Sequence, residues 1–432
     1  MRNVLLITYY FPPLGLGGVQ RPAKWVKYLP YSGWDADVVT VKDIVYYAAD
    51  STLCEDTSHA RVYRTGSLDP LRTARILDGN TSEKRAGNGR MRKRGRFFRR
   101  FINYGFIPDV RVTWVPFVLE CVRKLCGSGR QYDAVITTSP PNSCHLAGYF
   151  IRKLYGIPWV ADVRDDWYHE ILTRSPTFVH RALNTWIFKI ILRSAHSIVT
   201  VSAPIADHIR GVLKSRCPAL QTICNGYDED DFEDAEPEPE NKFTIVYTGS
   251  LTPYTNPGTF LAGLAQACER DAGLSENILV KMAGACIDVD VDGMVKKYHL
   301  EEQVRIYGYR SHRESIGMLR GCDTALLLIS EGLGRGMVTG KLFEYMGSGS
   351  YILAVAPQCA ATEILKEYRH YAVAAPGDTE AVAGHVIELY SMWKRGELKK
   401  KSGTGLSKKY SRKHQTAELA ALLDRVQHKQ YS

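Results

Sequence analysis

Short runs of β-branched and apolar residues alternate with longer helical stretches along this chain, and this alternation limits the folds available to it. In the first half the apolar runs lie at residues 4–10, 36–41, 134–139, 158–163 and 197–202. Helically spaced stretches separate them, for example at residues 21–33 and 142–156. A strand buried on both faces has a nearly continuous apolar sequence, and a helix between two such strands produces a parallel sheet. The pattern predicts a doubly wound α/β domain.

A second series of the same kind follows an acidic segment. Residues 228–240 (DEDDFEDAEPEPE) carry nine acidic and no basic side chains, and strands are then expected at residues 242–250, 277–285, 303–309, 324–330, 351–357 and 371–376. A chain of 432 residues is long enough for two domains. We expect a first domain at residues 1–230, a linker at 231–240, a second domain at 241–405, and a helix at 406–432 that can return to the first domain. Ligands would bind in a cleft beyond the carboxyl ends of the strands.

The net charge of +10 is concentrated in one segment. Residues 84–100 (KRAGNGRMRKRGRFFRR) hold nine basic and no acidic side chains, and the rest of the chain stands near +1. Phe97, Phe98, Phe101 and Ile102 accompany the cations, a mixture that suits an anionic membrane surface. Nucleic acid would fit the charge of the segment but not the nearly neutral remainder, so we expect none as a partner. A solvated loop is the alternative.

Cysteine usage and hydropathy bear on the compartment. The ten cysteines stand singly, with no C-x-x-C pair, which suits a reducing cytosol better than a disulfide scaffold. The first apolar run is too short for a secretory signal, and the most apolar later segment, residues 185–203, is interrupted by Lys189, Arg193 and His196. These features favour a cytoplasmic protein.

A glycine-rich stretch at residues 332–355 (GLGRGMVTGKLFEYMGSGSYILAV) nearly matches a phosphate-binding P-loop. The match fails because Arg335 replaces the first glycine and Leu342 replaces the Ser or Thr that would hold magnesium. A helix N-terminus beginning at Gly340, with Lys341 in its first turn, still suits a diphosphate. Glu344 lies three residues on and can accept hydrogen bonds from ribose hydroxyls. A surface ion pair between Lys341 and Glu344 is the alternative.

Further candidates follow strands of the first half. Gly17 and Gly18 start a helix after the first strand, but Gln20 breaks the dinucleotide fingerprint, which leaves an anion-binding turn. His145 follows the third strand, and Asp162, Arg164 and Asp165 surround the end of the fourth. A histidine and a carboxylate there can handle a sugar hydroxyl or a proton. A buried ion pair of Arg164 with either aspartate is the alternative.

The run IDVDVDG at residues 287–293 is similar to the D-x-D metal motif of one glycosyltransferase fold. Its aspartates Asp288, Asp290 and Asp292 lead into a helical stretch, so an exposed turn and helix start is the expectation.

Five segments in this order resemble a bacterial family 4 glycosyltransferase, a retaining enzyme of the GT-B fold with two Rossmann-like domains. They are YYFPPLGLGGVQR, SPPNSCHLAG with PWVADVRDDW, NGYDEDDF, YTGSL and VTGKLFEYMGSG. The resemblance implies a nucleotide-diphosphate sugar as donor, most simply UDP-linked, and neither metal nor cofactor. It implies that Glu344 binds ribose, that Gly340 and Lys341 bind the diphosphate, and that Gly17, Gly18 and Gly249 lie against the donor. His145, Asp165 and Lys341 are then the catalytic candidates.

Two positions depart from the family pattern. The family often has a second glutamate eight residues before Glu344, where this chain has Gly336. It also often has a basic pair after the YTGSL strand, where LTPYTNPG has no cation, which leaves Lys341, Arg310 and Arg335 to neutralise the leaving group. We expect a cytoplasmic glycosyltransferase, peripheral on the inner membrane face through residues 84–102, that extends a surface polysaccharide or lipid-linked glycan. The alternatives are a sugar-nucleotide epimerase of similar fold and a non-catalytic sugar-nucleotide-binding subunit.

Overall fold

The computed structural model describes residues 1–15, 17–42, 44, 49–69, 106–400 and 408–431. Contacts divide the chain into two units, one formed by Met1–Cys224 with Arg412–Ser432 and the other by Asn225–Ser411. We call them unit 1 and unit 2 and describe each by itself. The basic segment at residues 84–102 lies outside the described residues.

Unit 1 is built on a seven-stranded parallel sheet of order β3-β2-β1-β4-β5-β6-β7. The strands are β1 (Arg2–Thr8), β2 (Trp34–Val41), β3 (Arg61–Thr65), β4 (Ala134–Thr138), β5 (Trp159–Val163), β6 (Ser197–Thr200) and β7 (Ala219–Thr222). The helices are α1 (Gly17–Tyr28), α4 (Val115–Gly127), α5 (Ser143–Tyr155), α6 (Trp167–Arg174), α7 (Phe178–Arg193), α8 (Ala203–Leu213) and α18 (Arg412–Tyr431), with short 3-10 turns η1 (Leu29–Ser32), η2 (Thr52–Thr57), η4 (Val110–Trp114) and η5 (Lys214–Arg216). The strand order reverses between the neighbouring strands β1 and β4: β1 to β3 extend the sheet in one direction and β4 to β7 in the other.

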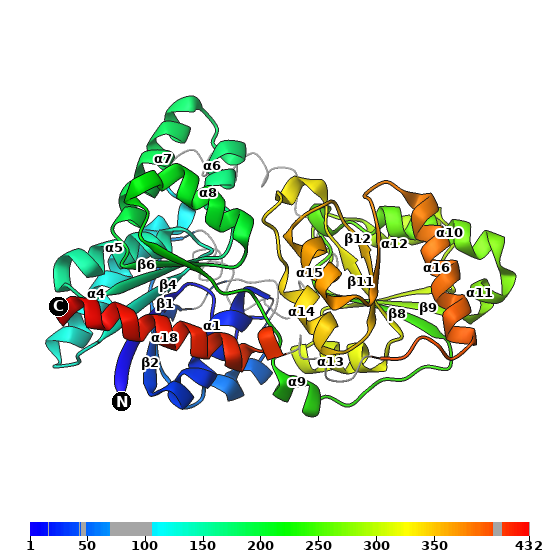
Figure 1. The fold of residues 1–432 in the computed structure, drawn as a ribbon, viewed down its shortest axis with the longest axis horizontal. Helices are drawn as coiled ribbons and strands as arrows, with labels where there is room; N and C mark the ends of the chain where they lie inside the picture. The colour runs from blue at the N-terminus through cyan, green and yellow to red at the C-terminus, as the bar shows by residue number, and fades with distance from the viewer. Residues whose placement is uncertain (16, 43, 45–48, 70–105, 401–407, 432) are drawn as a thin grey trace. The chain divides into compact units, whose positions relative to one another are not determined.

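Both faces of this sheet are covered, as its apolar strands require. Leu5 and Ile7 of β1 face a core that α4, α5, α7 and α8 complete, whereas Val4 and Leu6 face a second core. Helices α1 and α18 close that second core, so a segment from the far end of the chain lies beside α1 (Figure 1). Helix α18 contributes Leu419, Leu422, Leu423 and Val426 to this second core.

Unit 2 has a six-stranded parallel sheet of order β10-β9-β8-β11-β12-β13. Its strands are β8 (Phe243–Thr248), β9 (Ile278–Ala283), β10 (Val304–Gly308), β11 (Thr324–Leu328), β12 (Tyr351–Val355) and β13 (Tyr371–Ala374). Its helices are α9 (Glu229–Glu233), α10 (Gly258–Arg270), α11 (Ala272–Asn277), α12 (Val291–Lys297), α13 (His312–Gly321), α14 (Gly340–Gly347), α15 (Ala360–Tyr368) and α16 (Thr379–Lys394), with 3-10 turns η6 (Pro253–Thr255) and η7 (Glu331–Leu333). The two doubly wound domains of the predicted α/β fold are confirmed.

The segment expected as a linker at residues 231–240 is packed within unit 2. It begins inside α9, and its backbone then passes α13, where Glu238 N–H donates to the carbonyl of Gly317 at 3.2 Å. Arg320 Nη1 donates to the carbonyl oxygens of Phe232, at 2.7 Å, and Ala235. The acidic segment is therefore an ordered part of unit 2.

The described residues contain no helix that combines the length and the apolar character needed to cross a bilayer.

Candidate active site

The N-terminus of α14 in unit 2 has open backbone donors. Gly340 is its first residue, and the side chain of the preceding Thr339 makes no capping hydrogen bond. The first turn holds no acidic residue. Free N–H groups and the positive end of a helix dipole together favour an anion. The helix start that the glycine-rich sequence predicts is thus present without a cap of its own.

Lys341, in the first turn of α14, is held by strand β8. Its Nζ donates to the hydroxyl of Tyr247 at 2.5 Å and lies 4.4 Å from the centre of that ring. The Tyr247 hydroxyl in turn donates to the carbonyl of Ser250 at 2.8 Å. These contacts place the ammonium group at the carboxyl end of β8, beside the open helix N-terminus.

Gly249 provides the space that Lys341 occupies. A Cβ atom at Gly249 would lie 2.1 Å from Cε and 2.6 Å from Nζ of Lys341. The φ of Gly249 is also +112°, a backbone conformation that other residues rarely adopt. The sequence predicts Gly249 as a donor-binding residue, whereas its contact with Lys341 is visible only in the structure.

Tyr345 fixes α14 against the end of β8 from inside the core. Its hydroxyl accepts from the N–H of Thr248 at 3.1 Å and lies 3.3 Å from the carbonyl of the same residue. Burial raises the pKa of Tyr345 far above its usual value, so the phenol stays neutral. Glu344, the preceding residue, is half-buried, so a ligand can reach it. The Tyr345 contacts hold the helix that carries it.

The glycine-rich loop before α14 is anchored through its backbone. The N–H of Ser330 donates to the carbonyl of Tyr254 at 3.0 Å, and the carbonyl of Arg335 accepts from the N–H of Ala360 at 2.8 Å. The side chain of Arg335 is exposed, whereas Gly336, where the family often has a glutamate, is buried. Only Arg335 in this loop offers a cation to a ligand.

Arg310 follows β10, which is separated from β8 by β9. Its Nη1 donates to Oε1 of Glu314 at 3.2 Å, and its guanidinium lies 5.4 Å from the centre of the Tyr307 ring. Its charge is thus partly balanced within α13, which leaves Lys341 as the cation best placed at β8.

A pocket of about 300 Å³ lies at the same edge of the unit 2 sheet. Its walls come from the start of α10 and from the residues that end or follow β11, β12 and β13. The lining residues are Asn256, Gly258, Thr259, Ile329, Ser330, Val355 and Pro376. These residues lie far apart in the chain and were not predicted from the sequence. Their shared position after strand ends was the available signal.

In unit 1, Gly17 and Gly18 begin α1, and a Cβ atom at Gly17 would meet open space. Arg164, which follows β5, donates from Nη1 to the carbonyl of Gly18 at 2.9 Å and from Nε to the carbonyl of Ser139. The guanidinium therefore joins the start of α1 to the ends of β4 and β5. This arrangement brings a cation beside the first turn of α1.

His145 is placed by α5 and is fully buried. Its Nδ1 lies 2.8 Å from the hydroxyl of Thr137, and its ring stacks on Trp167 with centroids 5.8 Å apart. Its Nε2 has no hydrogen-bond partner among the described residues. Burial lowers the pKa of His145 to about 4, so the ring is neutral near pH 7. The free ring nitrogen is the part of His145 that remains for a ligand.

Asp162 and Asp165 have different surroundings. Asp162 is fully buried in an ion pair with Arg21 of α1, whose Nε and Nη2 lie 3.2 and 2.9 Å from its two oxygens. The alternative of a buried ion pair between Arg164 and Asp162 is therefore corrected, because the buried partner of Asp162 is Arg21. Asp165 is half-buried at the carboxyl end of β5, where a ligand can reach it.

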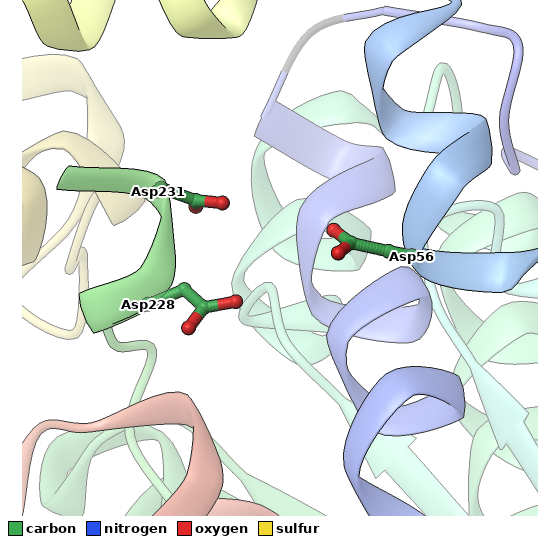
Figure 2. Close-up of side chains that lie close together, drawn as sticks. All are labelled: Asp56, Asp228 and Asp231. Atoms are coloured by element: carbon green, nitrogen blue, oxygen red, sulfur yellow. The ribbon is translucent and has the colours of Figure 1, made fainter. Parts of the chain in front are cut away.

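Figure 2 draws the side chains of three further aspartates, namely Asp56, Asp228 and Asp231. Asp56 belongs to unit 1 and pairs there with Lys24 at 2.7 Å. In unit 2, Asp228 caps α9, and Asp231 lies 2.9 Å from Nε2 of His312. Each carboxylate is engaged within its own unit, and we assign no metal ion to the three.

The aspartates of IDVDVDG serve a helix start. Oδ1 of Asp290 accepts from the N–H of Gly293 at 3.0 Å and thereby caps α12. This capping gives Asp290 a structural role.

Two family models match nearly the whole chain. A model described as a glycosyl transferase 4-like domain matches residues 17–226, and one described as glycosyl transferases group 1 matches residues 228–404. Among curated proteins none matches the chain in sequence.

Solved structures share the fold at low identity. WaaG, a glycosyltransferase involved in lipopolysaccharide biosynthesis, is 12% identical (TM-score 0.57; 99% of both chains). A sucrose-phosphate synthase from Thermosynechococcus elongatus is 13% identical (TM-score 0.58; 100% of this chain and 97% of that one). An α,α-trehalose-phosphate synthase from Burkholderia xenovorans is 8% identical (TM-score 0.62; 98% and 100%). With both family models and this shared fold, the chain belongs to the family 4-like glycosyltransferases of the GT-B fold.

Proposed function

We propose that this glycosyltransferase is a retaining enzyme that transfers a sugar from a nucleotide-diphosphate donor, UDP-linked in the simplest case, to a lipid-linked or polysaccharide acceptor. The observation that carries the proposal is the position of Lys341. Its ammonium group lies at the open N-terminus of α14, oriented by Tyr247 and accommodated by Gly249. A cation and a helix dipole at one point suit the negative charge that develops on a departing diphosphate.

The reaction balances without a protein nucleophile. The bond between C1 of the sugar and the phosphate oxygen breaks, and its electron pair leaves with the nucleoside diphosphate. An acceptor hydroxyl attacks C1 from the side of the leaving group and forms the new glycosidic bond with retained configuration. The hydroxyl proton passes to the departing phosphate oxygen. Lys341 and the N–H groups of α14 would stabilise that oxygen, and no metal ion is needed for this step.

The remaining candidates receive roles that suit their surroundings. Glu344 would accept hydrogen bonds from ribose hydroxyls, and the exposed Arg335 would supplement Lys341. In unit 1, the start of α1 at Gly17 and Gly18 would approach the phosphate or sugar. His145 would offer its free Nε2 to a sugar hydroxyl, and the half-buried Asp165 would serve the same region.

The pathway and compartment belong to the proposal as well. WaaG is described as involved in lipopolysaccharide biosynthesis, which supports a surface-glycan acceptor. All ten cysteines are free, which supports a reducing cytoplasm. Contact of residues 84–102 with the inner membrane face stays a prediction, because the segment lies outside the described residues.

The donor site is tested by removing Lys341 and by offering nucleotides. We expect Lys341→Ala to lower kcat about a hundredfold or more, since it removes a group that stabilises the transition state. Lys297→Ala is the matched control, because Lys297 also lies over a tyrosine of unit 2, 5.0 Å from the ring centre of Tyr298. Equal turnover by both variants would contradict the assigned role.

Thermal shift with UDP, GDP, ADP and dTDP identifies the nucleotide, because a ligand that binds the folded state raises Tm. Glu344→Ala should weaken the shift given by the preferred nucleotide. If none of the four raises Tm, the assignment of the donor site is contradicted. A sugar product released without an acceptor and changed in configuration would instead indicate the epimerase.

Gly249→Ala gives a second test of the same geometry. The new methyl group would collide with Lys341 and require a strained φ, so the ammonium group must leave its position. We expect a loss of kcat close to that of Lys341→Ala. Combining both substitutions should add little further loss, because residues that act as a unit are not additive. Full additivity would show that Gly249 acts independently of Lys341.

A further inference from the structure

The outward face of α7 in unit 1 is apolar although it faces solvent. Val179, Leu183 and Trp186 recur at intervals of four and three residues and are 55%, 41% and 60% exposed. The opposite face of the same helix packs Phe188 and Leu192 into the core. A surface helix normally carries polar residues on its outer face. Packing against the core explains the inner apolar face of α7 but not the outer one.

Neighbouring helices also expose apolar side chains. Phe178, at the start of α7, is 83% exposed, and Leu172 of α6 is also exposed. On α5, which packs beside α7, Phe150 and Leu154 are exposed as well. Figure 1 shows α6, α7 and α8 gathered on the side of the sheet away from α18. We call the exposed side chains of Phe178, Val179, Leu183 and Trp186 the α7 face.

The stretches of chain that contain α5 and α7 carry cations and no carboxylates. No aspartate or glutamate occurs between Glu170 and Asp207, a stretch that contains all of α7. None occurs between Asp133 and Asp162 either, which contains all of α5. The cations in these stretches include Lys153, Arg181, Lys189 and Arg193. Among the described residues no carboxylate forms a salt bridge with Lys153, Arg181 or Lys189, so their charges are available to an anionic partner.

We propose that the α7 face lies on an anionic lipid bilayer, with its apolar side chains in the headgroup boundary and its cations against lipid phosphates. An amphipathic helix binds a bilayer in this way without crossing it. Trp186 is suited to the boundary because its ring is apolar while its N–H remains hydrogen-bonded at the wet side. The cations contribute attraction to acidic headgroups within a Debye length.

A second copy of the chain fits the α7 face less well than a bilayer does. A two-fold contact would set the same patch against itself and bring Arg181 and Lys189 of both copies together. Like charges facing one another weaken such an interface, whereas acidic lipids complement them. The proposal does not rest on glycosyl transfer, and the residues that carry it are not those of the segment 84–102.

Vesicle sedimentation tests the α7 face in the full chain. The protein is mixed with vesicles of phosphatidylcholine alone or with phosphatidylglycerol added, and we expect binding to the acidic vesicles that weakens as salt is raised. Replacing both Leu183 and Trp186 by serine should weaken that binding about tenfold or more, since each removes apolar area from the boundary. Matched controls are Leu68→Ser and Tyr31→Ser, which alter side chains 69% and 76% exposed elsewhere in unit 1. Equal weakening by the control pair, or no weakening by the first pair, would overturn the proposal.

Tryptophan quenching places the contact at one residue. Trp25, Trp34, Trp114, Trp159 and Trp167 are buried, whereas Trp186 is exposed. Vesicles with brominated acyl chains should therefore quench part of the fluorescence of the wild type but not of Trp186→Phe, which should still sediment with vesicles. Quenching that persists in Trp186→Phe would overturn the proposal. So would concentration-dependent dimerisation of the wild type that the Leu183 and Trp186 substitutions abolish, because it would assign the α7 face to a second copy.

Discussion

At the scale of single residues, His145 links burial to pH dependence. The pKa of His145 is about 4 in the folded chain because burial disfavours the charged ring, and about 6.5 when the chain unfolds. Between these values the unfolded chain binds a proton that the folded chain does not. The free energy of unfolding therefore falls as the pH drops through this window, and is independent of this group at higher pH.

We expect proton uptake by His145 in the unfolded chain to lower the free energy of unfolding by about 2 kcal/mol between pH 7 and pH 5. Urea unfolding at both pH values measures the loss. In His145→Phe, which keeps an aromatic ring against Trp167, the difference between the two pH values should shrink by that amount. A variant whose pH dependence matches the wild type would show that His145 is not the group responsible.

The ion pair of Arg21 with Asp162 is the other feature at this scale. Arg21→Met would remove the ion pair from the buried Asp162 carboxylate and leave the Thr138 hydroxyl, 2.7 Å away, as its side-chain hydrogen-bond donor among the described residues. We expect unit 1 to lose about 3–5 kcal/mol of unfolding free energy, the usual cost of an uncompensated buried charge. Adding Asp162→Asn should recover part of the loss. Because six of the seven tryptophans lie in unit 1, intrinsic fluorescence follows this unit. A double variant no more stable than Arg21→Met alone would contradict the electrostatic explanation.

At the scale of elements, the acidic segment depends on two glycines of α13. A Cβ atom at Gly321 would lie 2.1 Å from the carbonyl oxygen of Glu238, and one at Gly317 would lie 2.5 Å from that of Glu236. Gly321→Ala should therefore displace the segment and destabilise unit 2 by about 1–3 kcal/mol. A protease that cleaves after glutamate should cut the variant faster. Gly384→Ala on α16 is the control, because its Cβ would meet open space and should leave cleavage unchanged.

Runs of apolar residues in the sequence predict most of the strands. All six strands of unit 2 and five of the seven in unit 1 have the apolar runs expected of them. The two that were missed, β3 (RVYRT) and β7 (ALQT), are the outer strands of the unit 1 sheet. An outer strand has fewer neighbours and keeps polar, exposed side chains, so its sequence resembles a loop.

The candidate site was predictable only in part for a related reason. The start of α14 at Gly340 could be predicted, because glycine spacing and the following helical pattern are local signals. The contact of Lys341 with Tyr247 joins residues 94 positions apart and has no local signal. The pocket beside Ser330 likewise combines residues from the start of α10 and from the ends of β11, β12 and β13.

At the scale of the whole molecule, unit 1 is assembled from two separate stretches of chain. Helix α18 follows unit 2 in the sequence but completes the second core of unit 1, where Leu419 and Leu423 are fully buried. Trp34 Nε1 also donates to Asp424 at 2.8 Å. The chain passes from one unit to the other at neighbouring points, since the N–H of Tyr227 donates to the carbonyl of Tyr410 at 3.1 Å.

Leu423→Ala should therefore destabilise unit 1 and not unit 2. Deleting a fully buried leucine side chain costs about 2–5 kcal/mol, and tryptophan fluorescence would follow the loss. Ala421→Ser, at an exposed position of the same helix, should be close to neutral. A shift confined to probes of unit 2, such as Trp393, would contradict the assignment of α18 to unit 1.

The position of α18 also has a consequence for synthesis on the ribosome. Domains commonly fold in the order in which they emerge, beginning at the N-terminus. Here residues 225–411 form a continuous unit that can finish folding while unit 1 still lacks the helix that covers one face of its sheet. During that interval the apolar strands and α1 are open to other chains. The part of the chain that is synthesised first therefore exposes an apolar sheet face until α18 has been made.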